Sequence, residues 1–200
     1  LSARSSKGLE GSDLAAEVTH VDPYEWHEGR WSWPEGHSDV KKDDHKVVAI
    51  DYGAKRNILR CLTNSGCDVT VLPADSTLET ILSHNPEGVF LSNGPGDPKA
   101  CEYAIDNIKT LFDKKIPLFG ICLGFQLLAL ASGSKTIKMK FGHHGANHPV
   151  MDLATKKVFI TSQNHGFMID DKNLSDNVVP THISLFDNSL QGFEVKEKYA

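Results

Sequence analysis

The sequence predicts an α/β fold: a doubly wound, mostly parallel sheet with helices on both faces and a short antiparallel excursion. Three observations support this prediction. From residue 46 onward, short continuous apolar runs recur, as expected of parallel strands covered on both faces. Segments with apolar residues at helical spacing separate these runs, which is the order of strands and helices in a doubly wound sheet. After residue 134 the helical spacing stops, and short strand-like segments follow one another.

The first part of this pattern predicts three strands with two helices between them. Gly66 follows a segment with helical spacing and is expected to end that helix. Ser76 is expected to cap the second helix, because Glu79 lies three residues later, as in a capping box. In chain order, the expected elements are a strand over 46–51, a helix over 54–65, a strand over 68–72, a helix over 76–84 and a strand over 88–91.

The second part predicts one more strand with its helices and then the antiparallel strands. Two loops, 93–98 and 120–124, follow strands of the parallel sheet and therefore lie at its carboxyl edge, where such sheets bind ligands. The expected elements are a helix over 99–112, a strand over 117–121, a helix over 125–132 and strands over 135–141, 157–162, 178–184 and 190–195.

Residues 1–45 are predicted to form an irregular arm, because they show no sustained strand or helix period. Leu9, Leu14 and Val18 have the spacing of one short helix, for which Ser12 is a candidate cap. The arm carries all three tryptophans, which we expect to pack it onto the body. The chain starts without Met, so this arm is interpreted as a link from an N-terminal domain.

The charge and the cysteines narrow the class of protein. The net charge is −5, and residues 1–45 hold ten acids against five bases, so the remaining residues carry sixteen of each. A body without a basic stripe argues against nucleic acid as a partner, since phosphate contacts need clustered Lys and Arg. No run reaches the 18 or so apolar residues of a membrane span. The four cysteines show no disulfide framework, which favours a reducing compartment and a cytoplasmic location.

The most informative segment surrounds Cys122. An apolar strand runs into Gly-Ile-Cys-Leu-Gly at 120–124 and continues directly into an apolar helix. This pattern is the cysteine form of a nucleophile elbow, a turn so tight that small residues must flank the nucleophile. Free backbone N–H groups and the helix dipole there are expected to favour a thiolate and to stabilise an oxyanion. Cys61, Cys67 and Cys101 lack the glycines and are interpreted as structural.

The histidines at 143, 144 and 148 raise the question of a metal site. Adjacent residues of a strand point to opposite faces, so His143 and His144 are not expected to reach one ion. No carboxylate or cysteine lies close to them in the sequence. We therefore predict no metal site in this chain.

Three motifs in this order resemble the class I glutamine amidotransferase family. They are Asn-Gly-Pro-Gly-Asp-Pro at 93–98, Gly-Ile-Cys-Leu-Gly-Phe-Gln at 120–126 and Gln-Asn-His-Gly-Phe at 163–167. Within this family, further segments are similar to the small, glutamine-hydrolysing chains of carbamoyl-phosphate synthetases, and the likeness covers residues 9–195. These segments lie at 51–58, 91–98, 138–145 and 184–187.

The resemblance implies a glutaminase domain over 46–200, in which Cys122 attacks the side-chain amide of L-glutamine to form a thioester. Backbone N–H groups of Leu123 and of the loop containing Gly94 and Gly96 would hold the oxyanion. It further implies that ammonia passes to a large synthetase subunit, which uses bicarbonate, ATP and Mg²⁺, whereas this chain itself needs no cofactor. The residues that it places around the glutamine pocket are Leu123, Gln126, Asn164, Gly166 and Phe167.

The chain departs from the family pattern in two places. Phe125 stands where the similar small chains usually carry His, which we expect to change packing or partner coupling and not the chemistry. The family takes its catalytic His from a His-Pro-Glu segment, so His165 is not the predicted base, and these 200 residues contain no such segment. The domain over 46–200 is therefore expected to be incomplete at its C-terminus, and this polypeptide alone is expected to show little glutaminase activity.

Three alternatives stay open at this point. One is another class I amidotransferase, such as those that feed GMP, CTP or anthranilate synthesis, although the segments 138–145 and 184–187 argue against it. Another is an interaction module that keeps the fold without the chemistry, against which the intact Cys122 argues. The third is a cysteine hydrolase of γ-glutamyl or peptide substrates on the same scaffold.

Overall fold

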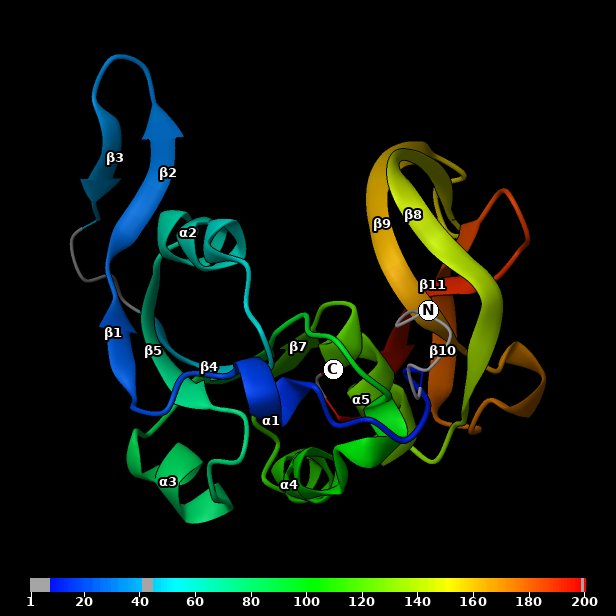
Figure 1. Ribbon diagram of the computed structural model, residues 1–200, viewed down its shortest axis with the longest axis horizontal. Coiled ribbons are helices and arrows are strands. Elements are labelled where there is room, and N and C mark those ends of the chain that lie inside the picture. The colour runs from blue at the N-terminus through cyan, green and yellow to red at the C-terminus, as the bar shows by residue number, and fades with distance from the viewer. Residues whose placement is uncertain (1–7, 41–44, 199) are drawn as a thin grey trace, which may run out of the picture.

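The computed structural model describes residues 8–40, 45–198 and 200. The described strands form two large sheets and one two-stranded sheet. Figure 1 shows one large sheet surrounded by helices and the other formed by the last third of the chain. The first sheet has the order β1-β5-β4-β6-β7, and all its neighbours are parallel except β1, which runs antiparallel to β5. Its strands are β1 (Tyr24–Trp26), β4 (His45–Asp51), β5 (Cys67–Pro73), β6 (Gly88–Leu91) and β7 (Leu118–Gly120).

Side chains alternate between the two faces of this sheet, and each face is covered by helices. On one face, Ala49, Val71 and Phe90 pack in a cluster with Leu59 of the first long helix. On the other face, the neighbouring residues of the same strands pack against the remaining helices. This arrangement confirms the predicted doubly wound sheet. The helices are α2 (Arg56–Asn64), α3 (Leu78–Ser83), α4 (Glu102–Asp113) and α5 (Leu123–Ala131).

The order of the strands places a topological switch point in the middle of the sheet. The chain moves from β4 to β5 on one side and then returns past β4 to β6 on the other. In doubly wound sheets the crevice for ligands opens beyond the carboxyl ends of the strands at this point. The loops after β4, β6 and β7 meet there, as the sequence predicted for 93–98 and 120–124.

The antiparallel strands differ from the prediction in two respects. They form a separate four-stranded sheet in the order β11-β10-β8-β9 and do not extend the parallel sheet. Two of its strands are also much longer than expected, so that the segment 163–167 lies inside a strand and not in a loop. The strands are β8 (Thr136–Asp152), β9 (Val158–Ile169), β10 (Val178–Ser184) and β11 (Leu190–Val195). The sequence predicted an end of β8 at residue 141, because glycines interrupt its pattern. In the structure the backbone bends at Gly142 and Gly145 with positive φ, and the strand continues.

The described part of the arm, residues 8–40, contains more regular structure than predicted. Besides β1 it contains a hairpin of β2 (Glu28–Ser32) and β3 (Gly36–Asp39), which projects from the body in Figure 1. Its helix α1 (Ala15–Val18) has only four residues, and its first turn is bonded by the Asp13 carboxylate and not by Ser12. Trp26 packs against the core as expected, whereas Trp31 and Trp33 are exposed.

Two helix boundaries were also predicted wrongly. The side chain that caps α3 belongs to Thr77, whose Oγ1 accepts from Thr80 N at 3.2 Å, and not to Ser76. The segment before α4 forms a short 3₁₀ turn, Pro98–Ala100, so the α-helix itself begins at Glu102. A second 3₁₀ turn, Asp171–Asn173, follows β9.

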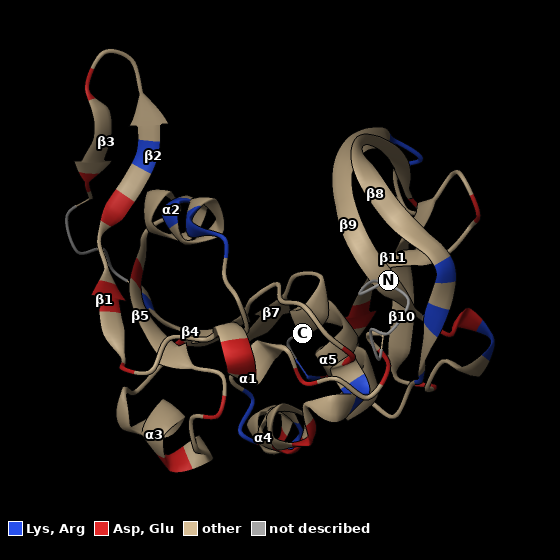
Figure 2. Ribbon diagram, in the orientation of Figure 1, with Lys and Arg blue, Asp and Glu red and all other residues tan. Residues whose placement is uncertain are grey.

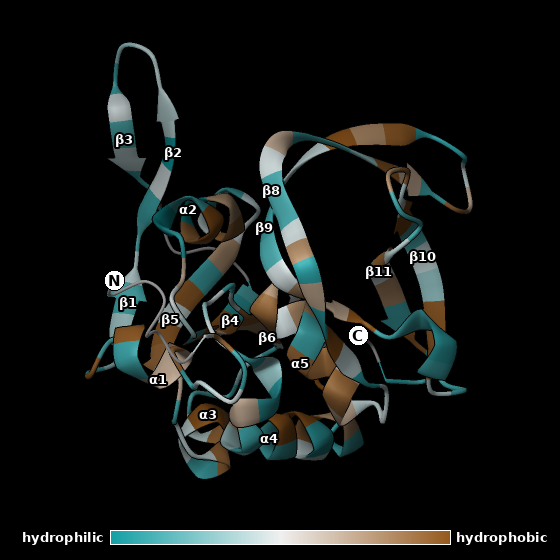
Figure 3. Ribbon diagram, turned by 45° about the vertical axis from the view of Figure 1, so that its right-hand side comes forward, coloured by the Kyte–Doolittle hydropathy of each residue, from teal (hydrophilic) through white to brown (hydrophobic). Residues whose placement is uncertain are grey.

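The hydropathy and charge of the ribbon agree with this architecture. Figure 3 shows α5 largely brown, as expected of a helix buried between the two sheets, and the β2–β3 hairpin teal to white. Figure 2 shows lysines and arginines dispersed among acidic residues along the described chain. Within these residues, no helix is long and apolar enough to cross a membrane.

Candidate active site

Cys122 lies at the turn between β7 and α5, in the geometry that the sequence predicted. Its φ is 55° and its ψ is −103°, a conformation that costs a non-glycine residue backbone strain. The turn can form only because both flanking glycines lack a side chain. A Cβ at Gly124 would lie 2.2 Å from the Leu91 carbonyl oxygen, and a Cβ at Gly120 would lie 2.5 Å from the Gly124 carbonyl carbon. Strain of this kind is typical of a nucleophile elbow.

The loop after β6 brings a second backbone N–H group to the cysteine. A Cβ at Gly94 would lie 2.2 Å from the Tyr52 carbonyl oxygen, so only glycine permits this close approach. Asn93 anchors the loop by donating to Gly53 O at 2.9 Å and accepting from Lys55 N at 3.0 Å.

Burial raises the pKa of the Cys122 thiol above its ordinary value. Hydrogen bonds from the Leu123 and Gly94 backbone N–H groups and the charge of Lys55 act in the opposite direction. The free N–H groups therefore lower the thiol pKa as expected, but burial raises this pKa by more. The expectation that the site favours a thiolate is thus corrected. The Leu123 and Gly94 N–H groups nevertheless converge on the sulfur, one from the first residue of α5 and the other from the loop after β6.

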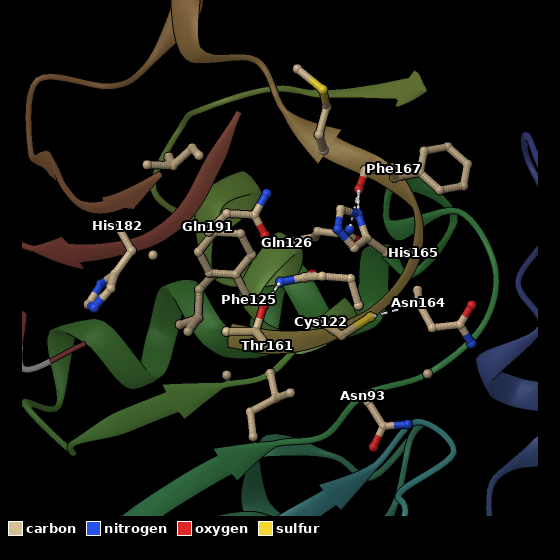
Figure 4. Close-up of a pocket in the computed structure, with 18 of the residues that line it drawn as sticks. Asn93, Cys122, Phe125, Gln126, Thr161, Asn164, His165, Phe167, His182 and Gln191 are labelled. Carbon is tan, nitrogen blue, oxygen red and sulfur yellow. Dashed lines mark hydrogen bonds between the residues drawn. The ribbon is translucent and has the colours of Figure 1, made fainter. Parts of the chain in front are cut away.

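Strand β9 supplies the opposite side of the site. The Cys122 thiol faces the Asn164 carbonyl oxygen at 3.9 Å. Gln126 on α5 is only 5% exposed and donates from Nε2 to the Phe167 carbonyl oxygen at 2.8 Å, which ties α5 to β9. Figure 4 shows Cys122, Gln126 and Asn164 gathered at one end of the cavity.

His165 belongs to the same side of the site but does not bond to the cysteine. Its Nδ1 lies 2.8 Å from the Phe167 carbonyl oxygen, so Nδ1 carries the proton. Burial lowers the pKa of His165 below its ordinary value of 6.5. Among the described residues, no histidine is hydrogen-bonded to Cys122, whose Sγ faces Asn164 O.

These residues surround a cavity of about 1070 Å³ between the two sheets. The structure brings seven of the eight predicted site residues to its wall; their functional roles remain predictions. Leu123 is the exception, because its side chain is buried in the core and only its N–H group faces the site. The seven are Gly94, Gly96, Cys122, Gln126, Asn164, Gly166 and Phe167.

Gly96 has a second set of contacts on the arm. A Cβ there would lie 2.6 Å from the Ser12 carbonyl oxygen, and Asp97 N donates to the same oxygen at 3.0 Å. The Asp97 carboxylate also accepts from Gly11 N at 3.0 Å. The arm therefore holds the glycine loop from outside.

Sequence reasoning missed two further contributors to the site. Lys55 lines the cavity beside Asn93. His144 Nδ1 donates to Asn164 Oδ1 at 2.8 Å and so orients that side chain. His143 bonds instead to Asp187, so the adjacent histidines have different partners. Within residues 8–40 and 45–198, no group of three His, Cys, Asp or Glu residues could hold a metal ion.

Comparison with known proteins places this geometry in a family. The family model described as "Glutamine amidotransferase class-I" matches residues 48–200. The chain is 60% identical over 198 residues to the carbamoyl phosphate synthase small chain of Ruegeria pomeroyi and 55% identical over 201 residues to that of Escherichia coli. These matches cover 98% and 99% of this chain but 51% and 53% of the relatives, so the chain spans about half their length.

Solved structures show the same fold. A putative GMP synthase subunit from Thermoplasma acidophilum matches with a TM-score of 0.64 at 23% identity, over 78% of this chain and 80% of the other. A glutamine amidotransferase from Thermotoga maritima matches with a TM-score of 0.63 at 21% identity, over 76% of this chain and 72% of the other. Together with the family model and the elbow around Cys122, these likenesses show that the chain belongs to the class I glutamine amidotransferase family.

Proposed function

We propose that this chain is the glutaminase part of a carbamoyl phosphate synthase small chain. In this role it hydrolyses L-glutamine to glutamate and ammonia, and the ammonia passes to a large synthetase subunit. The substrate and the partner are inferred from relatives that are 55–60% identical over nearly all of this chain and carry that name. The bicarbonate, ATP and Mg²⁺ of the synthetase reaction would bind to the large subunit, and this chain would need no cofactor of its own.

The observation that carries the proposal is the position of Cys122. It occupies a strained elbow, faces the cavity and has two backbone N–H groups converging on its sulfur. An ordinary buried cysteine needs none of these features. An acyl-transfer nucleophile needs all three, because a tetrahedral intermediate requires both access for the substrate and donors for its oxyanion.

The chemistry then follows from the arrangement. The Cys122 sulfur forms a bond to the side-chain carbonyl carbon of glutamine, and the Leu123 and Gly94 N–H groups stabilise the oxyanion. The carbon–nitrogen bond breaks, the nitrogen takes up a proton and ammonia leaves. Water then cleaves the thioester to give glutamate and the free thiol. Because burial raises the thiol pKa, the proton transfer needs a base that acts directly on Cys122.

We also propose that the 200 residues alone release little glutamate. His165 directly follows Asn164, whose carbonyl oxygen faces the thiol, but its Nδ1–H is bonded to Phe167 O and it makes no hydrogen bond to the thiol. The family pattern assigns the base to a His-Pro-Glu segment, and that triplet does not occur in these residues.

The test measures glutamate release from glutamine by the protein at its natural full length, together with labelling by a glutamine-analogue chloromethyl ketone. We expect turnover and modification at Cys122, and Cys122→Ser should lower turnover by at least about a thousandfold. Cys61→Ser on α2 is the matched control and should retain activity. An unlabelled Cys122 would instead support a module without chemistry, and turnover of the 200-residue chain near that of the full-length protein would refute its predicted inactivity.

A further inference from the structure

Two sequence segments that no step of the proposed reaction uses meet in the structure. His143 lies in the segment 138–145, and Asp187 ends the segment 184–187. His143 Nε2 lies 2.9 Å from Asp187 Oδ2, and the histidine is only 7% exposed. A link between residues 44 positions apart thus joins β8 to the loop between β10 and β11.

The Asp187 carboxylate is held in place from its other side. Its Oδ1 accepts from Ser189 N at 3.1 Å and from Ser189 Oγ at 2.7 Å. The Ser189 hydroxyl in turn accepts from Gln191 Nε2 at 2.9 Å, and Gln191 lines the cavity. Partial burial acts to raise the pKa of Asp187, but the hydrogen bonds from Ser189 and His143 outweigh it and lower this pKa. Asp187 is therefore an ionised acceptor.

The same geometry determines the tautomer of His143. Its Nδ1 is buried and has no hydrogen-bond partner among the described residues. A proton on Nδ1 would be a buried donor without an acceptor, which costs more than an unused lone pair. His143 therefore carries its proton on Nε2 and donates it to Asp187.

His143 transmits this link to the wall of the cavity. It pairs with His165 across β8 and β9, and the two rings meet edge to face with centroids 4.9 Å apart. His165 donates from Nδ1 to the Phe167 carbonyl oxygen, which also accepts from Gln126. The orientation of the His165 ring therefore helps to set the backbone position of the segment from Asn164 to Phe167.

We infer that Asp187 and His143 are positioning residues for the glutamine pocket, acting through His165 on the β9 wall opposite Cys122. The inference rests on the proposed function, because it assigns the pair to the binding of the proposed substrate. Neither residue bonds to Cys122, so the pair sets the shape of the pocket and not the reactivity of the thiol. This positioning role also explains why the segments 138–145 and 184–187, which hold His143 and Asp187, lie together.

The first test is the glutamine dependence of glutamate release by the full-length protein carrying Asp187→Asn. This variant can still accept from Ser189, but its amide cannot accept from His143 while doing so. We expect KM for glutamine to rise about tenfold while kcat changes less than about twofold. Asp106→Asn, which breaks only an exposed ion pair with Lys109 on α4, is the matched control and should leave KM unchanged.

The second test asks whether the two residues act as a unit. His143→Ala should raise KM about as much as Asp187→Asn, and the double variant should be no worse than His143→Ala alone. His143→Gln should restore most of the affinity, because its Nε2 can also donate to Asp187. Alkylation of Cys122 by iodoacetamide, which needs no glutamine pocket, should keep its rate in all these variants.

The outcomes separate the inference from the proposed function. A natural protein that releases no glutamate from glutamine overturns the proposed function and the inference with it. A natural protein that turns over glutamine, with KM unchanged in Asp187→Asn and His143→Ala, overturns the inference alone. Variants that merely lose part of their fold would lower kcat at constant KM, and that result also counts against the inference.

Discussion

The two walls of the cavity are built in different ways. The wall that contains Cys122 is made of backbone: a strained elbow, two glycines that allow close contact and N–H groups that face the sulfur. The wall that contains Asn164 is made of side-chain hydrogen bonds between segments far apart in sequence, such as Gln126 to Phe167 and His143 to Asp187. The comparison shows that sterics dictate the position of Cys122, whereas a polar network shapes the wall opposite it.

This difference predicts different responses to substitution. A side chain added to the elbow meets backbone atoms, which have no alternative position. A single substitution there should therefore displace the whole turn and cause a large loss in the free energy of unfolding. A side chain removed from the network leaves other hydrogen bonds in place. Each substitution on the opposite wall should therefore cause only a moderate loss in the free energy of unfolding.

The largest effect is expected from Gly124→Ala. Its Cβ would lie 2.2 Å from Leu91 O, so either α5 or β6 must move, at a cost of about 3 kcal/mol or more. Urea unfolding measures this loss. Gly88→Ala in β6 is the matched control, because its Cβ would meet its nearest neighbour, Pro117 O, only at 3.6 Å. If Gly124→Ala were as stable as Gly88→Ala, the steric account of the elbow would be wrong.

A smaller effect is expected from Gln126→Leu on the other wall. The change removes the bond to Phe167 O, but that oxygen keeps the hydrogen bond from His165, so the stability loss should be about 1–2 kcal/mol. Because the β9 wall loosens, KM for glutamine should rise more than kcat falls, as steady-state kinetics of the full-length protein would show. Unchanged kinetics would mean that Gln126 only packs α5 against the sheet.

Phe125→His should have a still smaller effect. Phe125 packs against Phe193 with ring centroids 4.9 Å apart and contacts an apolar cluster around Ile169. Histidine would lose part of this contact, so we expect a loss of about 1 kcal/mol in the free energy of unfolding. The rate of glutamate release should stay within about twofold, since the ring makes no bond to Cys122. A large loss of activity would place residue 125 in the chemistry.

The smallest effect concerns the pH dependence of stability. The folded pKa of His165 lies below 6.5, so the unfolded chain binds the proton more readily than the folded protein. Stability linked to His165 is thus complete above that pH and falls as the pH drops through 6.5 toward the folded pKa. His165→Gln should show a shallower decline between about pH 7.5 and about pH 5.5 in urea unfolding than the natural protein does. An equal decline would assign the pH dependence to other groups.

Local chemistry made the parallel half of the molecule predictable. Strands β4 to β7 and their helices were found within a few residues, because apolar periodicity and helix-ending glycines act over short distances. The elbow was predictable because its strand, glycine-flanked turn and helix follow one another directly in the sequence. The contact that excludes a side chain at Gly120 lies within this segment, whereas the contact at Gly124 is with Leu91 of the neighbouring strand β6. The family resemblance added the residues of the pocket, and the structure places seven of the eight predicted site residues along the cavity.

By itself, then, the sequence determined that Cys122 lies in a tight turn between a strand and a helix, flanked by glycines. Only the tertiary structure decided what faces it. Strand β1 of the arm forms because it pairs with the edge of β5. Strand β8 continues past its glycines because β9 and β10 pair along it. The bond between His143 and Asp187 likewise depends on the packing of strands that are remote in sequence. Such contacts form only when distant segments meet, and neither periodicity nor spacing records which partner a side chain will find.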